Sequence, residues 1–293
     1  MNRKHACLFL ISTLVIFPLF AGENVPRRII SCSPNVTEIL YELGLEDSVV
    51  GVTDFCRFPP RVRKKERIGG FLNPSLEKII ELRPELVIVP VTKSGPLLPK
   101  LDKLEIPVLK IPNETIEDLL KGISLIARKT GVPGRGKILK RRIESQLAAL
   151  GKQYRGNPRA KALIVVARSH SSLKDLYAAS ENTFLNELLI AAGGRNVLTR
   201  ETARYPKISK ESLVAMNPEV IIDATFSGQD LTTDALRMAL EPWKTLPSLD
   251  AVKSGRVHII TDPSITILGP RVVESIQTLA KYLHNKPEGE LLQ

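Results

Sequence analysis

Short apolar runs alternate with longer amphipathic stretches along most of the chain. From their composition we expect buried strands at residues 29–31, 49–52, 86–89, 108–111, 162–166, 220–223 and 257–260. Stretches with helical periodicity separate these runs. Alternation of strands and helices is typical of a parallel sheet. The pattern therefore predicts an α/β protein built from two βαβ Rossmann-like lobes.

An internal repeat supports two similar lobes. Four residues of the first half recur in the second half at a constant offset of 134 positions. They are Ser75, Glu77, Pro84 and Glu85, which recur as Ser209, Glu211, Pro218 and Glu219. At an offset of 149, Glu38, Leu40 and Gly44 recur as Glu187, Leu189 and Gly193. In the first pattern, a serine N-cap opens a helix that ends before proline and leads into a buried strand. A glutamate in the first turn also suits the helix dipole.

The middle of the chain predicts a connector. Glycines and a proline between residues 131 and 136 precede a charged helical stretch from Lys137 to about Tyr154. We expect this single long α-helix to join the lobes, with the ligand cleft between them. The predicted divisions are a signal peptide at 1–21, an N-terminal lobe at 24–131, the connecting helix at 132–156, a C-terminal lobe at 157–288 and a tail at 289–293.

The first residues have the features of an export signal. Arg3 and Lys4 precede an apolar stretch at residues 8–20, and Ala21 offers a cleavage site. Cys7 lies before the apolar stretch, which is the wrong place for the lipid-bearing cysteine of a lipoprotein. We therefore expect a free periplasmic protein.

Charge narrows the range of partners. Lysine and arginine number 42 against 31 acidic residues, which gives +11, and loss of Arg3 and Lys4 would leave +9. This surplus could reflect an anionic ligand, an anionic envelope surface or an ordinary basic surface. The basic run at residues 61–67 has no interleaved aromatic residues that would stack on bases, so nucleic acid is not expected as a partner.

Cysteines and histidines offer little chemistry. Cys32 and Cys56 each follow a strand-like run, and they could form a disulfide in an oxidising compartment or remain two thiols. His170, His258 and His284 have no partners at metal-ligand spacing. We expect neither a metal site nor a cofactor.

Several segments together resemble the periplasmic binding proteins for cobalamin and iron chelates, in which one rigid helix joins two lobes. The resemblance covers the mature chain, is closest to the cobalamin-binding members, and is carried by residues 31–38, 51–55, 58–60 and 69–77. It implies a monomeric solute-binding subunit of an ABC importer that delivers a non-covalently bound corrinoid to a membrane permease. In that family a surface glutamate of each lobe docks onto permease arginines, and Glu77 and Glu211 match those positions.

Ligands of open α/β sheets bind beyond the carboxyl ends of the strands. The candidate ligand-binding residues there are Ser33, Pro34, Asn35, Phe55, Phe71, His170, Tyr177, Arg204, Tyr205 and Asp262. By resemblance, the two phenylalanines and two tyrosines occupy aromatic cleft positions and Asp262 a cleft aspartate. Aromatic walls suit the broad apolar face of a corrin or porphyrin.

Other functions remain open at this stage. Where the cobalamin-binding members have tryptophans, this chain has Phe71, Pro90 and Tyr205, which keeps haem or a ferric siderophore as alternative ligands. An exported hydrolase using Ser169, His170 and Asp262 is a further alternative, but no Gly-x-Ser-x-Gly elbow is present and catalysis is not expected. Because one continuous helix hinges less freely than several crossing strands, we expect only small closure of the lobes on binding.

Overall fold

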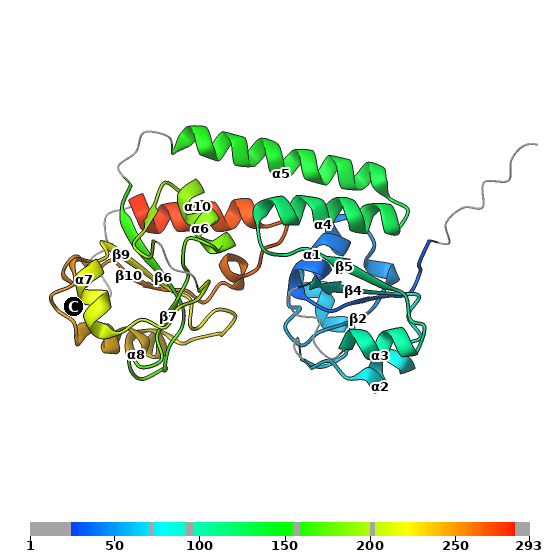
Figure 1. The fold of residues 1–293 in the computed structure, drawn as a ribbon, viewed down its shortest axis with the longest axis horizontal. Helices are drawn as coiled ribbons and strands as arrows, with labels where there is room; N and C mark the ends of the chain where they lie inside the picture. Colours follow the sequence, from blue (N-terminus) through cyan, green and yellow to red (C-terminus); the bar gives the residue numbers. More distant parts are fainter. Residues whose placement is uncertain (1–24, 71–72, 92–96, 155–158, 200–202, 285–293) are drawn as a thin grey trace, which may run out of the picture.

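The structure is a computed structural model that describes residues 25–70, 73–91, 97–154, 159–199 and 203–284. It contains two lobes, each built on a five-stranded sheet flanked by helices (Figure 1). The predicted α/β class with two lobes is confirmed. The predicted signal peptide, its cleavage site and the C-terminal tail lie outside the described residues. No helix of the described part is both long and apolar enough to cross a membrane.

The N-terminal lobe has a parallel sheet in the order β3-β2-β1-β4-β5. Its elements are β1 (Ile29–Ser31), α1 (Pro34–Glu42), η1 (Glu46–Ser48), β2 (Val49–Val52), η2 (Pro60–Lys64), β3 (Glu66–Arg67), α2 (Leu76–Glu81), β4 (Leu86–Pro90), α3 (Leu97–Lys103), β5 (Val108–Ile111) and α4 (Ile116–Lys129). The four predicted strands are present, because their apolar side chains fill the space between sheet and helices. Strand β3 was not predicted, because its two residues are polar.

The C-terminal lobe repeats this plan with one exception. Its elements are β6 (Lys161–Ala167), β7 (Tyr177–Ala178), α6 (Phe184–Ala191), β8 (Arg195–Asn196), α7 (Lys210–Met216), β9 (Val220–Asp223), α8 (Thr233–Lys244), α9 (Asp250–Lys253), β10 (Val257–Ile259), η4 (Pro263–Thr266) and α10 (Val272–His284). The strand order is β10-β9-β6-β7, and β8 also pairs with β6. Strand β7 is antiparallel to β6, unlike the other pairs.

The repeated serines cap equivalent helices. The Ser75 Oγ accepts a hydrogen bond from the Lys78 backbone N–H at 3.2 Å at the start of α2, and the Ser209 Oγ accepts one from the Ser212 N–H at 3.1 Å at the start of α7. Each cap satisfies a backbone donor that the helix itself leaves free. The predicted N-caps are therefore confirmed in both lobes.

Helix α5 (Pro133–Gln153) connects the lobes and runs beside α4, α6 and α10 (Figure 1). It begins at Pro133, within the predicted range of 132–156, because proline suits a first helical turn, and the glycines that follow are part of the helix. Gly136 lies against α4, where a Cβ atom would come within 2.4 Å of the Ala127 Cβ. The glycine thus permits close packing of the two helices.

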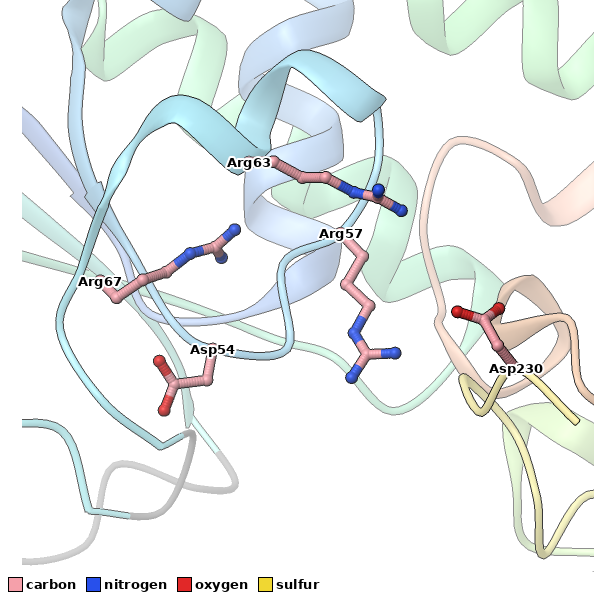
Figure 2. A pocket seen from close by; sticks show the side chains of 5 residues that line it. All are labelled: Asp54, Arg57, Arg63, Arg67 and Asp230. Carbon is pink, nitrogen blue, oxygen red and sulfur yellow. The ribbon is translucent and has the colours of Figure 1, made fainter.

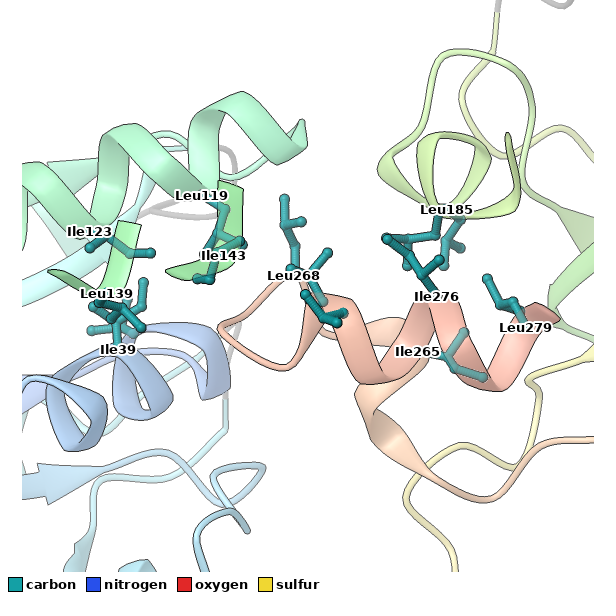
Figure 3. Close-up of a cluster of buried hydrophobic side chains, with 14 of the residues drawn as sticks. Ile39, Leu119, Ile123, Leu139, Ile143, Leu185, Ile265, Leu268, Ile276 and Leu279 are labelled. Carbon is teal, nitrogen blue, oxygen red and sulfur yellow. The ribbon is translucent and has the colours of Figure 1, made fainter. Parts of the chain in front are cut away.

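One apolar cluster runs through both lobes (Figure 3). On the N-terminal side, Ile39 of α1 packs with Leu119 and Ile123 of α4 and with α5. On the C-terminal side the cluster includes α6 and α10, and buried Leu268 lies between the two groups (Figure 3). The lobes therefore share a core beside the connecting helix, which supports the expectation of small closure.

Candidate functional site

Loops at the carboxyl ends of the strands meet where the two lobes face each other. The loop after β2 carries Arg57, whose guanidinium donates to the Gly228 carbonyl in the loop after β9. Next to this contact is an open pocket of about 430 Å³ lined by Asp54, Arg57, Arg63, Arg67 and Asp230. Figure 2 shows the three arginines on the N-terminal lobe and Asp230 opposite Arg57. Residues of both lobes thus line one solvent-accessible space, as the predicted cleft requires.

Four aromatic side chains are exposed, two in the loop that carries Arg57 and two in the C-terminal lobe. Phe55 and Phe58 in the loop after β2 are 56% and 40% exposed, and Tyr177 and Tyr205 in the C-terminal lobe are 38% and 39% exposed. No other phenylalanine, tyrosine or tryptophan of the described residues is exposed to this degree. The Arg271 guanidinium lies 4.1 Å from the centroid of the Phe58 ring and so accounts for Phe58, whereas core packing does not explain Phe55, Tyr177 or Tyr205. Phe71 lies outside the described residues.

Tyr177 and Tyr205 lie on neighbouring segments of the C-terminal lobe. Tyr177 forms an isolated bridge with Lys207, so its strand lies beside the segment of Tyr205. Desolvation raises the pKa of Tyr205, and neighbouring Arg204 partly opposes the increase. Arg204 itself pairs with Glu114 of the N-terminal lobe. This salt bridge places the Tyr205 segment at the junction of the lobes.

Side-chain hydrogen bonds stabilise the loop after β1. The Ser33 Oγ donates to the Asn35 Oδ1 at 2.6 Å, and the Asn35 amide donates to the Asn113 Oδ1 at 2.7 Å. Ser33 and Asn35 are buried and Pro34 is half-buried at the start of α1. These contacts fix the shape of the loop, and the assignment of the three residues to the ligand stays a prediction.

Asp262 and His170 are exposed but have protein partners. The Asp262 carboxylate accepts from the Ser264 N–H at 2.9 Å and lies 3.8 Å from the Arg271 guanidinium. The His170 ring lies against Phe226, with centroids 5.0 Å apart. No group of three or more metal-ligating side chains is found among the described residues.

Glu77 and Glu211 occupy equivalent exposed positions, each in the first turn of a helix capped by the repeated serine. Hydrogen bonds from its own backbone N–H and from Ser209 lower the pKa of Glu211, so this carboxylate is charged at neutral pH. Helices α2 and α7 belong to different lobes (Figure 1). One carboxylate per lobe is thus available at the surface.

Cys32 and Cys56 are free, buried thiols in the structure, so the disulfide considered from the sequence is not formed. Burial raises the pKa of Cys32 to about 12 and also raises that of Cys56. The Cys56 sulfur lies 3.1 Å from the Thr37 and Thr53 hydroxyls. Both cysteines therefore act as neutral core residues.

Two features were missed from the sequence. The pocket arginines come from a loop, a 3₁₀ helix and a short strand, so only the fold brings Arg57, Arg63 and Arg67 together. The pair between Glu38 of α1 and Arg271 joins the lobes through hydrogen bonds of 2.6 and 3.1 Å. The sequence offered only two indications of these residues: the charge of each side chain and, for Glu38, its recurrence in the internal repeat.

Comparisons with known proteins agree with this architecture. The chain is 28% identical to an uncharacterized ABC transporter substrate-binding lipoprotein of Bacillus subtilis, over 89% of this chain and 81% of that protein. It is 27% identical to a cobalamin-binding protein of Halobacterium salinarum, over 90% of this chain and 71% of that one. A crystal structure of a periplasmic haem-binding protein from Pseudomonas aeruginosa matches with a TM-score of 0.74 and 26% identity, over 88% of this chain and 93% of that chain.

The family model described as periplasmic binding protein matches residues 29–264, which include most of both lobes. Members of this family are the solute-binding components of ABC importers, and they bind solutes without converting them. The predicted resemblance is confirmed, and the chain belongs to the periplasmic binding protein family.

Proposed function

We propose that this protein captures a corrinoid of the cobalamin type between its lobes and delivers it to an ABC permease. The observation that carries the proposal is the exposure of aromatic side chains on both lobes, Phe55 on the N-terminal lobe and Tyr177 and Tyr205 on the C-terminal lobe. Exposed aromatic faces provide a large contact area for a flat macrocycle at little cost in side-chain entropy. The Halobacterium relative named as a cobalamin-binding protein supports this choice of ligand.

Haem is the second candidate ligand. The matched structure from Pseudomonas aeruginosa is a haem-binding protein, and exposed His170, Tyr177 and Tyr205 are side chains that suit a ferric centre. A ferric siderophore would use the same tyrosines. The three ligands have different absorption spectra, so one experiment separates them.

The test is a titration of the purified protein with cyanocobalamin, haem and ferric hydroxamate, followed by absorbance and tyrosine fluorescence. Binding of cyanocobalamin with a saturable spectral change is expected. Substituting Phe55→Ala together with Tyr205→Ala should weaken it at least about tenfold, because each stacking contact contributes roughly 1 kcal/mol. Ile138→Ala, an exposed change on α5, is the matched control. Saturable binding of haem alone would transfer the proposal to haem.

Delivery depends on Glu77 and Glu211. Both are exposed, one on each lobe, and carboxylates form strong charge-assisted pairs with arginine. Reversing both charges, with Glu77→Lys and Glu211→Lys, should abolish uptake into cells or vesicles and leave ligand affinity unchanged. Glu144→Lys on α5 makes the same charge change as either single substitution, at another exposed site, and should leave uptake intact. Normal uptake by the double variant would refute this docking role.

A further inference from the structure

The pocket between the lobes has one wall of arginines. Arg57 follows β2, Arg63 belongs to η2 and Arg67 to β3, while Asp54 and Asp230 supply the acidic groups (Figure 2). Among the described residues, none of these five side chains lies within ion-pair distance of an opposite charge. Three guanidinium groups beside one open space are therefore not neutralised by contact.

Backbone carbonyls position two of the arginines. The Arg67 Nη1 donates to the Thr53 and Cys56 carbonyls at 2.8 and 2.9 Å, which fixes the loop between them. Arg57 reaches across to the Gly228 carbonyl. A guanidinium has five N–H donors, so Arg57 retains donors for a ligand. Arg63 is exposed, and its side chain has no hydrogen bond to another described residue.

A neighbouring arginine shows the contrast. Arg61, two residues before Arg63, forms an ion pair with Glu46 at 2.9 Å, and its guanidinium lies over the Tyr41 ring. Its charge is satisfied by the protein itself. The same short helix therefore holds one arginine engaged by the protein and one directed to the pocket.

We infer that Arg57 and Arg63 bind an anionic group of the captured ligand, with Arg67 holding the loop that presents them. Three arginines and two aspartates leave the pocket a charge of +1. This balance favours a monoanionic group, a phosphodiester or a single carboxylate, over a dianion. The inference rests on the proposed function for the ligand that carries this group.

The recognition energy should come from charge-assisted, bidentate hydrogen bonds, which the planar guanidinium forms with both phosphate and carboxylate oxygens. The pocket is open, so salt should weaken the interaction. The aromatic side chains would hold the apolar face of the chelate while the arginines fix its orientation.

Matched ligands test the inference. Cyanocobalamin carries a phosphodiester that cobinamide lacks, and haem carries carboxylates that are blocked in its dimethyl ester. The protein variant is Arg57→Gln with Arg63→Gln, and Arg61→Gln is the control. The double variant should bind the anionic member of the pair about tenfold more weakly and the neutral member unchanged, because charged hydrogen bonds are lost. Arg61→Gln should behave as wild type with both.

A ligand-independent measurement separates this inference from the proposed function. Inorganic phosphate at constant ionic strength should shift arginine Nε–Hε NMR resonances saturably in the wild type and in Arg61→Gln, but not in the double variant. This result without binding of any chelate would uphold the anion site and refute the proposed function. Equal weakening of both members of a ligand pair would overturn the inference, as would the absence of a saturable phosphate shift.

Discussion

Helices α1 and α6 are equivalent elements of the two lobes, yet they join the lobes by different chemistry. Gly44 and Gly193 follow them with positive φ angles of 67° and 84°, and Leu40 and Leu189 are fully buried. Left-handed glycines after both helices are a common way to end a helix. The repeat seen in the sequence therefore marks real structural equivalence.

The matched glutamates of these helices each reach the opposite lobe. Glu38 is 2% exposed and forms a bidentate pair with Arg271 of the C-terminal lobe. Glu187 is half-buried and accepts from the Ile116 N–H at 2.7 Å, at the start of α4 in the N-terminal lobe. One bridge joins two charges, and the other joins a charge to a helix N-terminus. The comparison teaches that a repeated residue keeps its place while its partner diverges.

The largest effect is expected from Arg271→Gln. The substitution leaves the Glu38 carboxylate buried without its cation, which should lower the free energy of unfolding by about 4 kcal/mol at neutral pH. Burial already raises the pKa of Glu38 against the opposing effect of Arg271. Loss of the arginine should raise it further, so protonation should make the destabilisation smaller at lower pH. Urea denaturation at neutral and at acidic pH measures the loss of stability and its decrease on protonation of Glu38.

Two variants control for this result. Lys281→Gln removes an exposed cation from α10, the helix that follows Arg271, and should be nearly neutral. Combining Arg271→Gln with Glu38→Gln removes both charges and should restore part of the lost stability. A loss below about 1 kcal/mol for Arg271→Gln would show that the pair does not hold the lobes together.

A smaller effect is expected from acid and His258, which lies in the C-terminal lobe with the other described histidines. The His258 ring stacks on Tyr282, and burial, with a smaller effect of Arg256, lowers the pKa of His258 from 6.5 to about 4. Between these values the unfolded chain binds the proton more readily. The contribution of neutral His258 to the free energy of unfolding should therefore be fully present above pH 6.5, and the free energy should fall by up to about 3 kcal/mol toward pH 4. Calorimetry of wild type and His258→Gln at a series of pH values measures this loss. If the variant lost as much stability as wild type over the same pH range, the prediction would be wrong.

The sequence predicted the sheets well, because buried parallel strands are continuous apolar runs. The bounds of β1, β2, β5 and β9 agree with the predicted ranges. Strands β3, β7 and β8 were missed, since two residues carry no periodicity. The connecting helix, predicted at 132–156, is observed at Pro133–Gln153, and Gly136 within it serves helix packing.

The candidate site was less predictable. Phe55 and Tyr205 are exposed in loops, as expected, whereas Tyr177 is exposed on strand β7, and contact of all three with a ligand stays a prediction. Arg57 was not among the predicted site residues, because a charged residue alone gives no sign of its neighbours. Arg271 lies 233 residues from Glu38, and no local pattern connects two such positions.

The smallest expected effect comes from Glu187→Gln, which tests the second bridge. The amide can still accept the hydrogen bond from Ile116 but loses the attraction of a charge to the N-terminus of α4, so the free energy of unfolding should fall by about 1 kcal/mol. Glu117→Gln removes an exposed charge from the first turn of α4 together with its ion pair to Lys121 at 2.7 Å, so its effect is an upper bound on the helix-dipole contribution. Chemical denaturation of both variants measures the difference. If Glu187→Gln destabilised the protein as much as Arg271→Gln, the two bridges would be energetically equal, and the distinction drawn between α1 and α6 would be wrong.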